Sequence, residues 1–360
     1  NWLYIVDVET GQTLYKEQLL DPVDNSSGGA AVAEPAAVDT DGDGYLDRIY
    51  VGTLEGFLYR VDLRNAIGEP PILKPTFDFV EFSPGIFFGI GVEHITDPDF
   101  RPRLVFKAQP DPATAGPPSR AIYFRPSVIF SAGLGEYVIA FGVGDRENLW
   151  SSDGARGVFY LFRDDIGVGD PTFYTEADLV QIDSALDGDR ADDLLTDPTL
   201  ATKGWFLQLR EDERLITNPF AVSGVVVFTV FEPDVAVDLE SLTCSRTGRS
   251  RVFGVTATNA NGLLFSGGQR TRWFDIADFV TEPYIEQSAT KNPDSGNEGG
   301  NADELTADHL AIMDELKKLF PQNCKFANYR LDIKTLSSDT GIHLIAPIPI
   351  CIVEKNWKEF

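Results

Sequence analysis

The chain has 360 residues, of which 43% are hydrophobic and 11% aromatic, enough for a large buried core. Its 56 acidic and 30 basic residues give a formal net charge of −26, which repels nucleic acid and anionic membrane surfaces. No run of about eighteen apolar residues occurs, so no transmembrane segment is predicted.

The chain opens directly in a strand pattern, Trp2-Leu3-Tyr4-Ile5-Val6. No signal peptide precedes this strand. We therefore expect the chain to be a fragment or a processed form of a longer protein.

The most informative segment is residues 39–50, Asp-Thr-Asp-Gly-Asp-Gly-Tyr-Leu-Asp-Arg-Ile-Tyr. Four carboxylates within nine residues repel one another unless a cation neutralises them. Calcium suits such a site because it takes six to eight oxygen ligands in flexible geometry. The spacing therefore predicts Ca²⁺ as cofactor, bound by the side chains of Asp39, Asp41, Asp43 and Asp47 and the carbonyl of Tyr45.

This loop differs from an ordinary EF-hand at its C-terminal end. Gly44 stands where the loop must turn sharply, and glycine adopts positive φ most easily. The position of the usual bidentate glutamate is Tyr50, within a β-type run. We expect an EF-hand-like loop that leads into a strand, and the alternative is a solvated acidic turn.

A strand motif recurs along the first 290 residues. The copies begin at residues 3, 57, 103, 158, 204 and 251, steps of roughly fifty residues. Short strands at this period are typical of a β-propeller in which each repeat is one four-stranded blade. Continuous apolar runs at 137–142 and 225–229 fit strands buried on both faces. The predicted fold class is therefore all-β, a quinoprotein-dehydrogenase-like β-propeller of six to seven blades with the first blade incomplete; a β-sandwich is the alternative.

The remaining residues change in character. Residues 291–302 are polar and glycine-rich and are typical of a flexible linker after a propeller at 1–290. Residues 303–360 predict an extension in which an amphipathic helix, stopped by Pro321, precedes strands at 325–336 and 342–353. This hairpin could close the ring beside the first blade, or one of its strands could join a partner's sheet.

Three cysteines leave the redox compartment undecided. Cys324 and Cys351 stand on either side of the hairpin turn and could meet across its strands, the alternative being two buried thiols. Cys244 would then be unpaired, or paired to a segment missing from this sequence.

The sequence contains no recognisable catalytic motif. His94, His309 and His343 are scattered, and no nucleotide-binding loop or nucleophile elbow occurs. Quinone-dependent dehydrogenases of this repeat type use, by resemblance, a disulfide between adjacent cysteines, which this chain does not have. We expect that the protein is not an enzyme.

Several motifs carry a resemblance to a known family, and their joint order is more specific than any one of them. They are the calcium loop with 49–53, the run 56–62, Phe141-Gly142-Val143-Gly144, Gly204-Trp205-Phe206-Leu207, Glu213-Arg214-Leu215, Asn218-Pro219, Gly224-Val225-Val226-Val227-Phe228-Thr229 and Pro233. Together they resemble the C-terminal propeller of the PilY family of type IV pilus tip and biogenesis proteins.

The resemblance implies a calcium-regulated module at a pilus tip or cell surface, exported through the periplasm and outer membrane. Such a protein would tune pilus extension against retraction, prime assembly with minor pilins, and support twitching motility and adhesion to host or abiotic surfaces. The five calcium ligands predicted above carry over directly from the family. The alternatives are a generic extracellular binding propeller and, as a third class, a quinone-dependent dehydrogenase.

Overall fold

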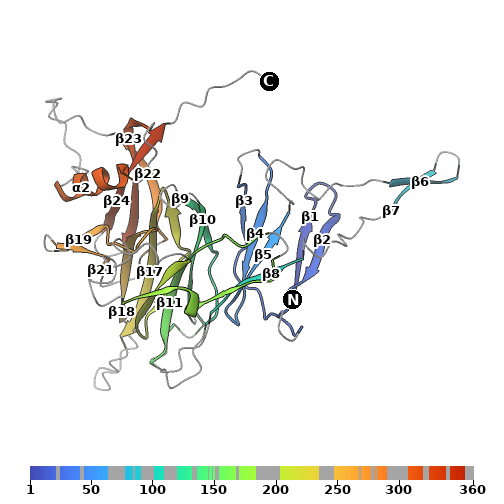
Figure 1. Cartoon of the computed structure of the whole chain (residues 1–360), viewed down its shortest axis with the longest axis horizontal. Helices are drawn as coiled ribbons and strands as arrows, with labels where there is room; N and C mark the ends of the chain where they lie inside the picture. Colours follow the sequence, from blue (N-terminus) through green and yellow to red (C-terminus); the bar gives the residue numbers. More distant parts are fainter. Residues whose placement is uncertain are drawn as a thin grey trace. The chain divides into compact units, whose positions relative to one another are not determined.

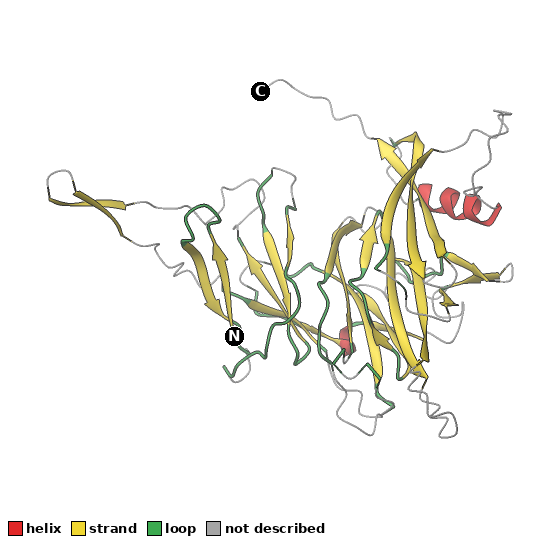
Figure 2. Cartoon of the chain, turned by 180° about the vertical axis from the view of Figure 1, so that it is seen from behind, coloured by secondary structure: helices red, strands yellow, loops and turns green. Residues whose placement is uncertain are grey.

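The computed structural model describes residues 1–21, 25–40, 44–63, 78–83, 86–90, 101–108, 120–131, 136–144, 146–147, 149–150, 154–167, 170–183, 203–234, 247–266, 269–276, 280, 282–289, 307–318, 324–337 and 341–352. Within these ranges the elements are strands except for one α-helix and one short 3-10 turn, as the ribbon in Figure 2 shows. The predicted all-β class is therefore confirmed.

The chain forms two compact units. Unit 1 comprises Asn1–Pro110, Ser119–Pro126 and Asp165–Ala177, and unit 2 comprises Asp111–Pro118, Ser127–Asp164 and Asp178–Phe360. The predicted boundary near residue 290 remains a prediction, because the expected linker at 291–302 lies outside the described residues.

Unit 1 is built on one five-stranded sheet in the order β12-β8-β5-β4-β3 (Figure 1). Its strands are β3 (Ala36–Val38), β4 (Arg48–Gly52), β5 (Phe57–Asp62), β8 (Arg103–Lys107) and β12 (Tyr174–Thr175). All pairs are antiparallel except β12 with β8, which is parallel. Two hairpins complete the unit: β1 (Trp2–Val6) with β2 (Thr13–Gln18), and β6 (Asp78–Ser83) with β7 (Ile86–Ile90).

The strand predicted at residues 2–6 is β1, and its side chains alternate between buried and exposed faces. Leu3 and Ile5 pack against a core that includes Tyr15 and Tyr59, whereas Trp2 and Tyr4 are about half exposed. This two-residue period is that of a strand with one buried face. β1 therefore contributes Leu3 and Ile5 to the core of unit 1, and β2 contributes Tyr15.

Unit 2 contains two larger sheets. One has the order β13-β14-β11-β10-β9 and the other β15-β17-β18-β21, with β16 also paired to β17. The first is made of β9 (Ser127–Ser131), β10 (Glu136–Val143), β11 (Arg156–Arg163), β13 (Val180–Asp183) and β14 (Gly204–Glu211). The second is made of β15 (Arg214–Leu215), β16 (Phe220–Val222), β17 (Val225–Asp234), β18 (Thr247–Thr256) and β21 (Trp273–Ile276).

Aromatic rings join the two sheets of unit 2. The rings of Phe159 and Phe228 stack with centroids 3.7 Å apart, and Phe228 stacks on Phe253 at 4.6 Å. A Cβ at Gly142 would lie 2.7 Å from the Leu215 side chain, so a residue without a side chain is needed there for the close approach. The runs predicted at 137–142 and 225–229 lie in β10 and β17 and are mostly buried, as expected for strands covered on both faces.

The C-terminal region of unit 2 adds a helix and a third sheet. The helix α2 (Ala307–Lys317) precedes β23 (Lys325–Ser337) and β24 (Gly341–Ile352), close to the predicted bounds. Both strands belong to a sheet of order β22-β23-β24, with β22 at Tyr284–Ala289. A small hairpin of β19 (Leu264–Ser266) and β20 (Gln269–Thr271) lies between the larger sheet and β22 in the chain.

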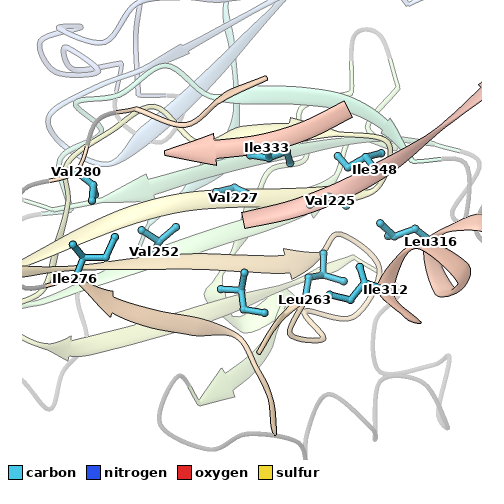
Figure 3. Packing of buried hydrophobic residues seen from close by; sticks show 11 residues of the cluster. Val225, Val227, Val252, Leu263, Ile276, Val280, Ile312, Leu316, Ile333 and Ile348 are labelled. Atoms are coloured by element: carbon cyan, nitrogen blue, oxygen red, sulfur yellow. The ribbon is translucent and has the colours of Figure 1, made fainter. Parts of the chain in front are cut away.

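One apolar cluster holds these C-terminal elements together. Ile312 and Leu316 of α2 lie in the same core as Ile333 of β23, Ile348 of β24 and Val227 of β17 (Figure 3). The 3.6-residue period of the helix places Ile312 and Leu316, four residues apart, on one face. The predicted amphipathic helix and hairpin are thus confirmed, and the helix packs on the hairpin.

Cys324 is disulfide-bonded. In the ladder of β23 and β24, Cys351 pairs with Phe326, two residues after Cys324, so the two cysteines lie near the same end of the hairpin. That Cys351 is the partner of Cys324 stays a prediction. Cys244 lies outside the described residues.

The fifty-residue repeat needs correction in its detail. The copies beginning at 57 and 103 are β5 and β8 of one sheet, and those at 158 and 204 are β11 and β14 of another, so they are not separate blades. The equivalent strands β4, β10 and β17 begin at residues 48, 136 and 225, so the sheets recur about every 90 residues. A strand motif repeats within a sheet because neighbouring buried strands need the same apolar side chains.

Candidate metal centre

The predicted calcium loop joins β3 to β4 in unit 1. Asp39, Tyr45 and Asp47 lie within the described residues, whereas Asp41 and Asp43 lie outside them. The strands on either side pair directly, with Val38 opposite Arg48. The loop is therefore held at both ends by one antiparallel ladder.

Asp47 is fixed at the end of the loop by its backbone. Its N–H donates to the carbonyl of Val38 at 2.9 Å, and its carbonyl accepts from the N–H of Leu63 at 2.7 Å. The side chain is buried, with 6% of the residue exposed, and Oδ2 accepts from the Thr40 backbone N–H at 2.6 Å and the Thr40 hydroxyl at 2.5 Å. This carboxylate therefore turns back over the start of the loop.

Asp39 is oriented in the same way from the other end. Its Oδ2 accepts from the N–H of Gly44 at 2.8 Å, and Gly44 has φ of 92°. A Cβ at Gly44 would meet nothing within 4 Å, so the positive φ is what favours glycine at this turn. The sharp turn predicted at this position is confirmed.

Tyr45 contributes through its backbone in the predicted ligand set. Its side chain is 57% exposed, so the ring takes no part in the core. Tyr45 is predicted as a ligand only through its carbonyl oxygen, a donor type that calcium loops use at this position.

The described residues fit a hard cation. Asp39 and Asp47 face the loop's own N–H groups, and a carboxylate has about four acceptor directions, so these bonds do not exhaust its capacity to bind an ion. Within the described ranges, no group of three or more His, Cys, Asp or Glu side chains is placed to hold a metal ion. Two of the four predicted carboxylates lie outside those ranges, so calcium binding stays a prediction.

A buried ion cluster lies beside the start of β4, where the loop ends. Asp62, at the end of β5, is 1% exposed and binds Arg60, whose Nη2 lies 3.2 Å from Oδ2, and the Nη2 of Arg103. The Nε of Arg48, the residue after Asp47, lies 3.5 Å from Asp62 Oδ1. Removing one partner of such a buried cluster costs about 3–5 kcal/mol, since it leaves an uncompensated charge.

The sequence carries a weak signal for Asp62. It ends the repeated motif Leu58-Tyr59-Arg60-Val61-Asp62, and Asp7 ends the first copy of that motif. The Asp7 carboxylate accepts the N–H groups of Glu9 and Thr10 at 2.8 Å each; the Thr10 bond chiefly holds the pKa of Asp7 below its usual value. The same motif position therefore serves a turn in one copy and a buried counter-ion in the other.

No helix among the described residues combines the length and apolar character that crossing a bilayer requires.

No protein-family model and no curated protein matches the chain. Among solved structures it is similar to the crystal structure of the Pseudomonas aeruginosa PilY1 C-terminal domain, with a TM-score of 0.52 and 17% sequence identity. The match covers 95% of this chain and 66% of that chain, just under two thirds of its length. The fold is therefore the propeller-like fold of that domain, which confirms, at the level of fold, the resemblance that the motifs predicted.

Proposed function

We propose that the chain is a calcium-binding module of a type IV pilus tip and assembly protein, one that regulates pilus extension and retraction. The support is the PilY1-like fold over 95% of the chain, together with a loop in which the carboxylates of Asp39 and Asp47 accept hydrogen bonds from the loop's own N–H groups. In this role the module acts outside the cell, with minor pilins and a host or abiotic surface as partners. It binds and regulates, and it performs no catalysis.

The regulation we propose is electrostatic. Calcium supplies two positive charges to a loop that carries four carboxylates. Without that charge, Asp39 and Asp47 are repelled by their neighbours, and the bonds that close the loop through Gly44 and Thr40 are weakened. Occupancy therefore fixes the start of β4 and the surface next to it.

Calorimetry with calcium tests the site. We expect Asp39→Asn and Asp47→Asn each to weaken calcium affinity at least about tenfold, the equivalent of about 1.4 kcal/mol. Asparagine retains an acceptor oxygen for the Gly44 and Thr40 donors, so the loss reports the charge of the ligand. The control is Glu211→Gln, an exposed carboxylate in unit 2 that pairs with Arg156. Equal affinity in all four proteins would refute the site.

A cellular experiment tests the role. The full-length protein carrying Asp47→Asn is expected to give fewer surface pili and reduced twitching than the parent, with equal amounts of protein. Glu211→Gln should leave the number of surface pili and the extent of twitching unchanged. A parent-like number of pili in the Asp47→Asn strain would separate calcium binding from pilus regulation and overturn the proposal.

A further inference from the structure

One segment of unit 1 is separated in the sequence from the rest of that unit. Asp165–Ala177, which we call the strap, belongs to unit 1, although the residues before and after it belong to unit 2. Apart from residues 168 and 169, the structure describes all of the strap. Its hold on unit 1 therefore depends on contacts made along about a dozen residues.

Two arginines bind the strap through its backbone carbonyls. Arg103 Nη1 donates to the carbonyl of Gly167 at 2.9 Å and to that of Asp170 at 3.1 Å. Arg60 Nη2 donates to the same Gly167 carbonyl at 3.2 Å. These charge-assisted bonds fix the first half of the strap.

The second half is held by strand pairing and side chains. β12 adds to β8 with Tyr174 opposite Phe106, and the Tyr174 hydroxyl donates to Asp165 Oδ1 at 2.5 Å. Arg120 lies 3.6 Å from Glu176. These contacts involve neither the loop nor Asp62, so they give the strap a fixed end. Among the contacts of the described residues, Gly167 and Asp170 are bound to the sheet of unit 1 by the two arginines.

Both arginines are positioned by Asp62. Arg60 is fully buried, and its Nε and Nη2 donate to Asp62 Oδ2 at 3.3 and 3.2 Å. Arg103 Nη2 donates to the same oxygen. A single buried carboxylate thus sets the direction of both guanidinium groups that bind the strap.

Asp62 is also connected to the calcium loop by two routes. Arg48 pairs with Asp62 across the β4–β5 ladder, and its Nε lies 3.5 Å from Asp62 Oδ1. The next residue, Leu63, donates its N–H to the carbonyl of Asp47 at 2.7 Å. Any displacement of Asp47 and the start of β4 therefore acts on Asp62 and on the residue after it.

We propose that Asp62 is a positioning residue that transmits calcium occupancy of the 39–47 loop to the strap. An ion-filled loop fixes β4, β4 and Leu63 fix Asp62, and Asp62 holds Arg60 and Arg103 on the carbonyls of Gly167 and Asp170. Loss of calcium loosens the strap at this point. The inference rests on the proposed function, because it requires that the loop bind calcium.

Hydrogen exchange measured by mass spectrometry tests the coupling between the loop and the strap. It is measured on the full chain, with calcium and with chelator. The reporting amides are those of Asp170, bonded to the Gly167 carbonyl, and Thr172, bonded to Asp170 Oδ1. Calcium is expected to slow their exchange at least about tenfold. The internal reference is β5, because calcium stabilises all of unit 1 and only the protection of the strap relative to β5 reports coupling.

The variants are Asp62→Asn and Arg103→Lys. Both should keep calcium binding by calorimetry, and in both the effect of calcium on the strap should fall to that on β5. Arg103→Lys keeps the charge and loses the two-pronged donor, so it serves if Asp62→Asn does not fold. The matched control is Arg156→Gln, which breaks an exposed ion pair with Glu211 in unit 2 and should behave as the parent.

The outcomes separate the two proposals. A parent that binds calcium while its strap gains no more protection than β5 overturns the coupling and leaves the proposed function intact. Variants that retain the parent's calcium effect on the strap overturn the role of Asp62. A parent that shows no calcium binding in calorimetry removes the proposed function and the coupling together.

Discussion

At the residue scale, Tyr59 places a phenol in the interior of unit 1. It is fully buried, and within the described residues its hydroxyl makes no hydrogen bond. Burial raises the pKa of Tyr59 well above its usual value of 10, and the charges of Asp21 and Glu55 add to this effect. The folded protein therefore holds this proton more tightly than the unfolded chain does.

The sign of the resulting pH dependence is set by linkage. Above pH 10 the unfolded chain loses the Tyr59 proton first, so the free energy of unfolding falls as pH rises, by up to about 1.4 kcal/mol per pH unit. We expect Tyr59→Phe to reduce this alkaline loss, with stability near pH 7 equal to or slightly above that of the parent. Denaturant unfolding at pH 7, 10 and 11 measures the free energy of unfolding of parent and variant. Tyr4→Phe, at a half-exposed position, is the control, and an unchanged alkaline slope in Tyr59→Phe would contradict the assignment.

Some residues of the candidate site could be predicted from the sequence and others could not. Gly44 and Asp39 were predictable because the loop is local: its ligands, its turn and its closing bonds lie within nine residues. Asp62 was not predictable, since its partner Arg103 is 41 residues away and its role depends on which strands become neighbours. Ion pairs between distant strands leave no periodic pattern in the sequence.

At the scale of elements, the C-terminal hairpin is part of the core of unit 2. Ile333 of β23 and Ile348 of β24 are fully buried in the cluster that also contains Val225 and Leu316. We expect Ile333→Ala and Ile348→Ala each to lower the free energy of unfolding by about 2–5 kcal/mol, because each leaves a cavity.

Leu336→Ala is the matched control for these two variants. Leu336 lies on the same strand as Ile333 but is 43% exposed, so its loss should cost no more than about 0.5 kcal/mol. Urea denaturation of the three variants measures the difference. Equal stability of Ile333→Ala and Leu336→Ala would show that the hairpin is not part of the folded core.

The structure bears on the two roles considered for this hairpin, closing the ring and adding a strand to a partner's sheet. β23 pairs with β22, so the hairpin completes a sheet within unit 2. β24 is the terminal strand of that sheet, and Pro347 and Pro349 occupy alternate positions, opposite Asp332 and Arg330. Proline has no N–H to donate to a ladder, and an edge strand such as β24 is where a sheet tolerates it.

The elements themselves were largely predictable and their pairing was not. Runs such as those in β10 and β17 and the 3.6-residue period of α2 are local signals. Sheet membership is decided by contacts between distant segments: β13 joins β14 in parallel and β12 joins β8 in parallel, and neither β12 nor β13 has more than four residues. Such short strands carry no pattern that would reveal their partners.

At the scale of the whole molecule, calcium should act on the two units unequally. The loop lies in unit 1, and an ion that binds only the folded form stabilises it by about 2.7 kcal/mol at a hundred times its dissociation constant. We expect calcium to raise the protection of β4 and β5 amides against global unfolding and to leave β17 and β18 nearly unchanged. Hydrogen exchange at increasing denaturant measures the protection of the amides in β4 and β5 and of those in β17 and β18.

Magnesium chloride at equal ionic strength is the control for this experiment. The net charge of −26 means that any salt relieves repulsion, and this general effect should reach both units alike. A calcium effect that magnesium reproduces in full, in unit 1 and unit 2 together, would assign it to screening and not to a bound ion.

The strap has a consequence for how the polypeptide matures. Neither compact unit is a continuous stretch of chain, since β12 is made only after β9, β10 and β11 of the other unit. At about 5–20 residues per second, the ribosome adds this last strand of the loop-bearing sheet roughly 10 s after it has made the acidic loop. Nascent chains that end before residue 174 carry all the predicted ligands on an unfinished sheet, so unit 1 is completed late although its predicted ligands are synthesised early.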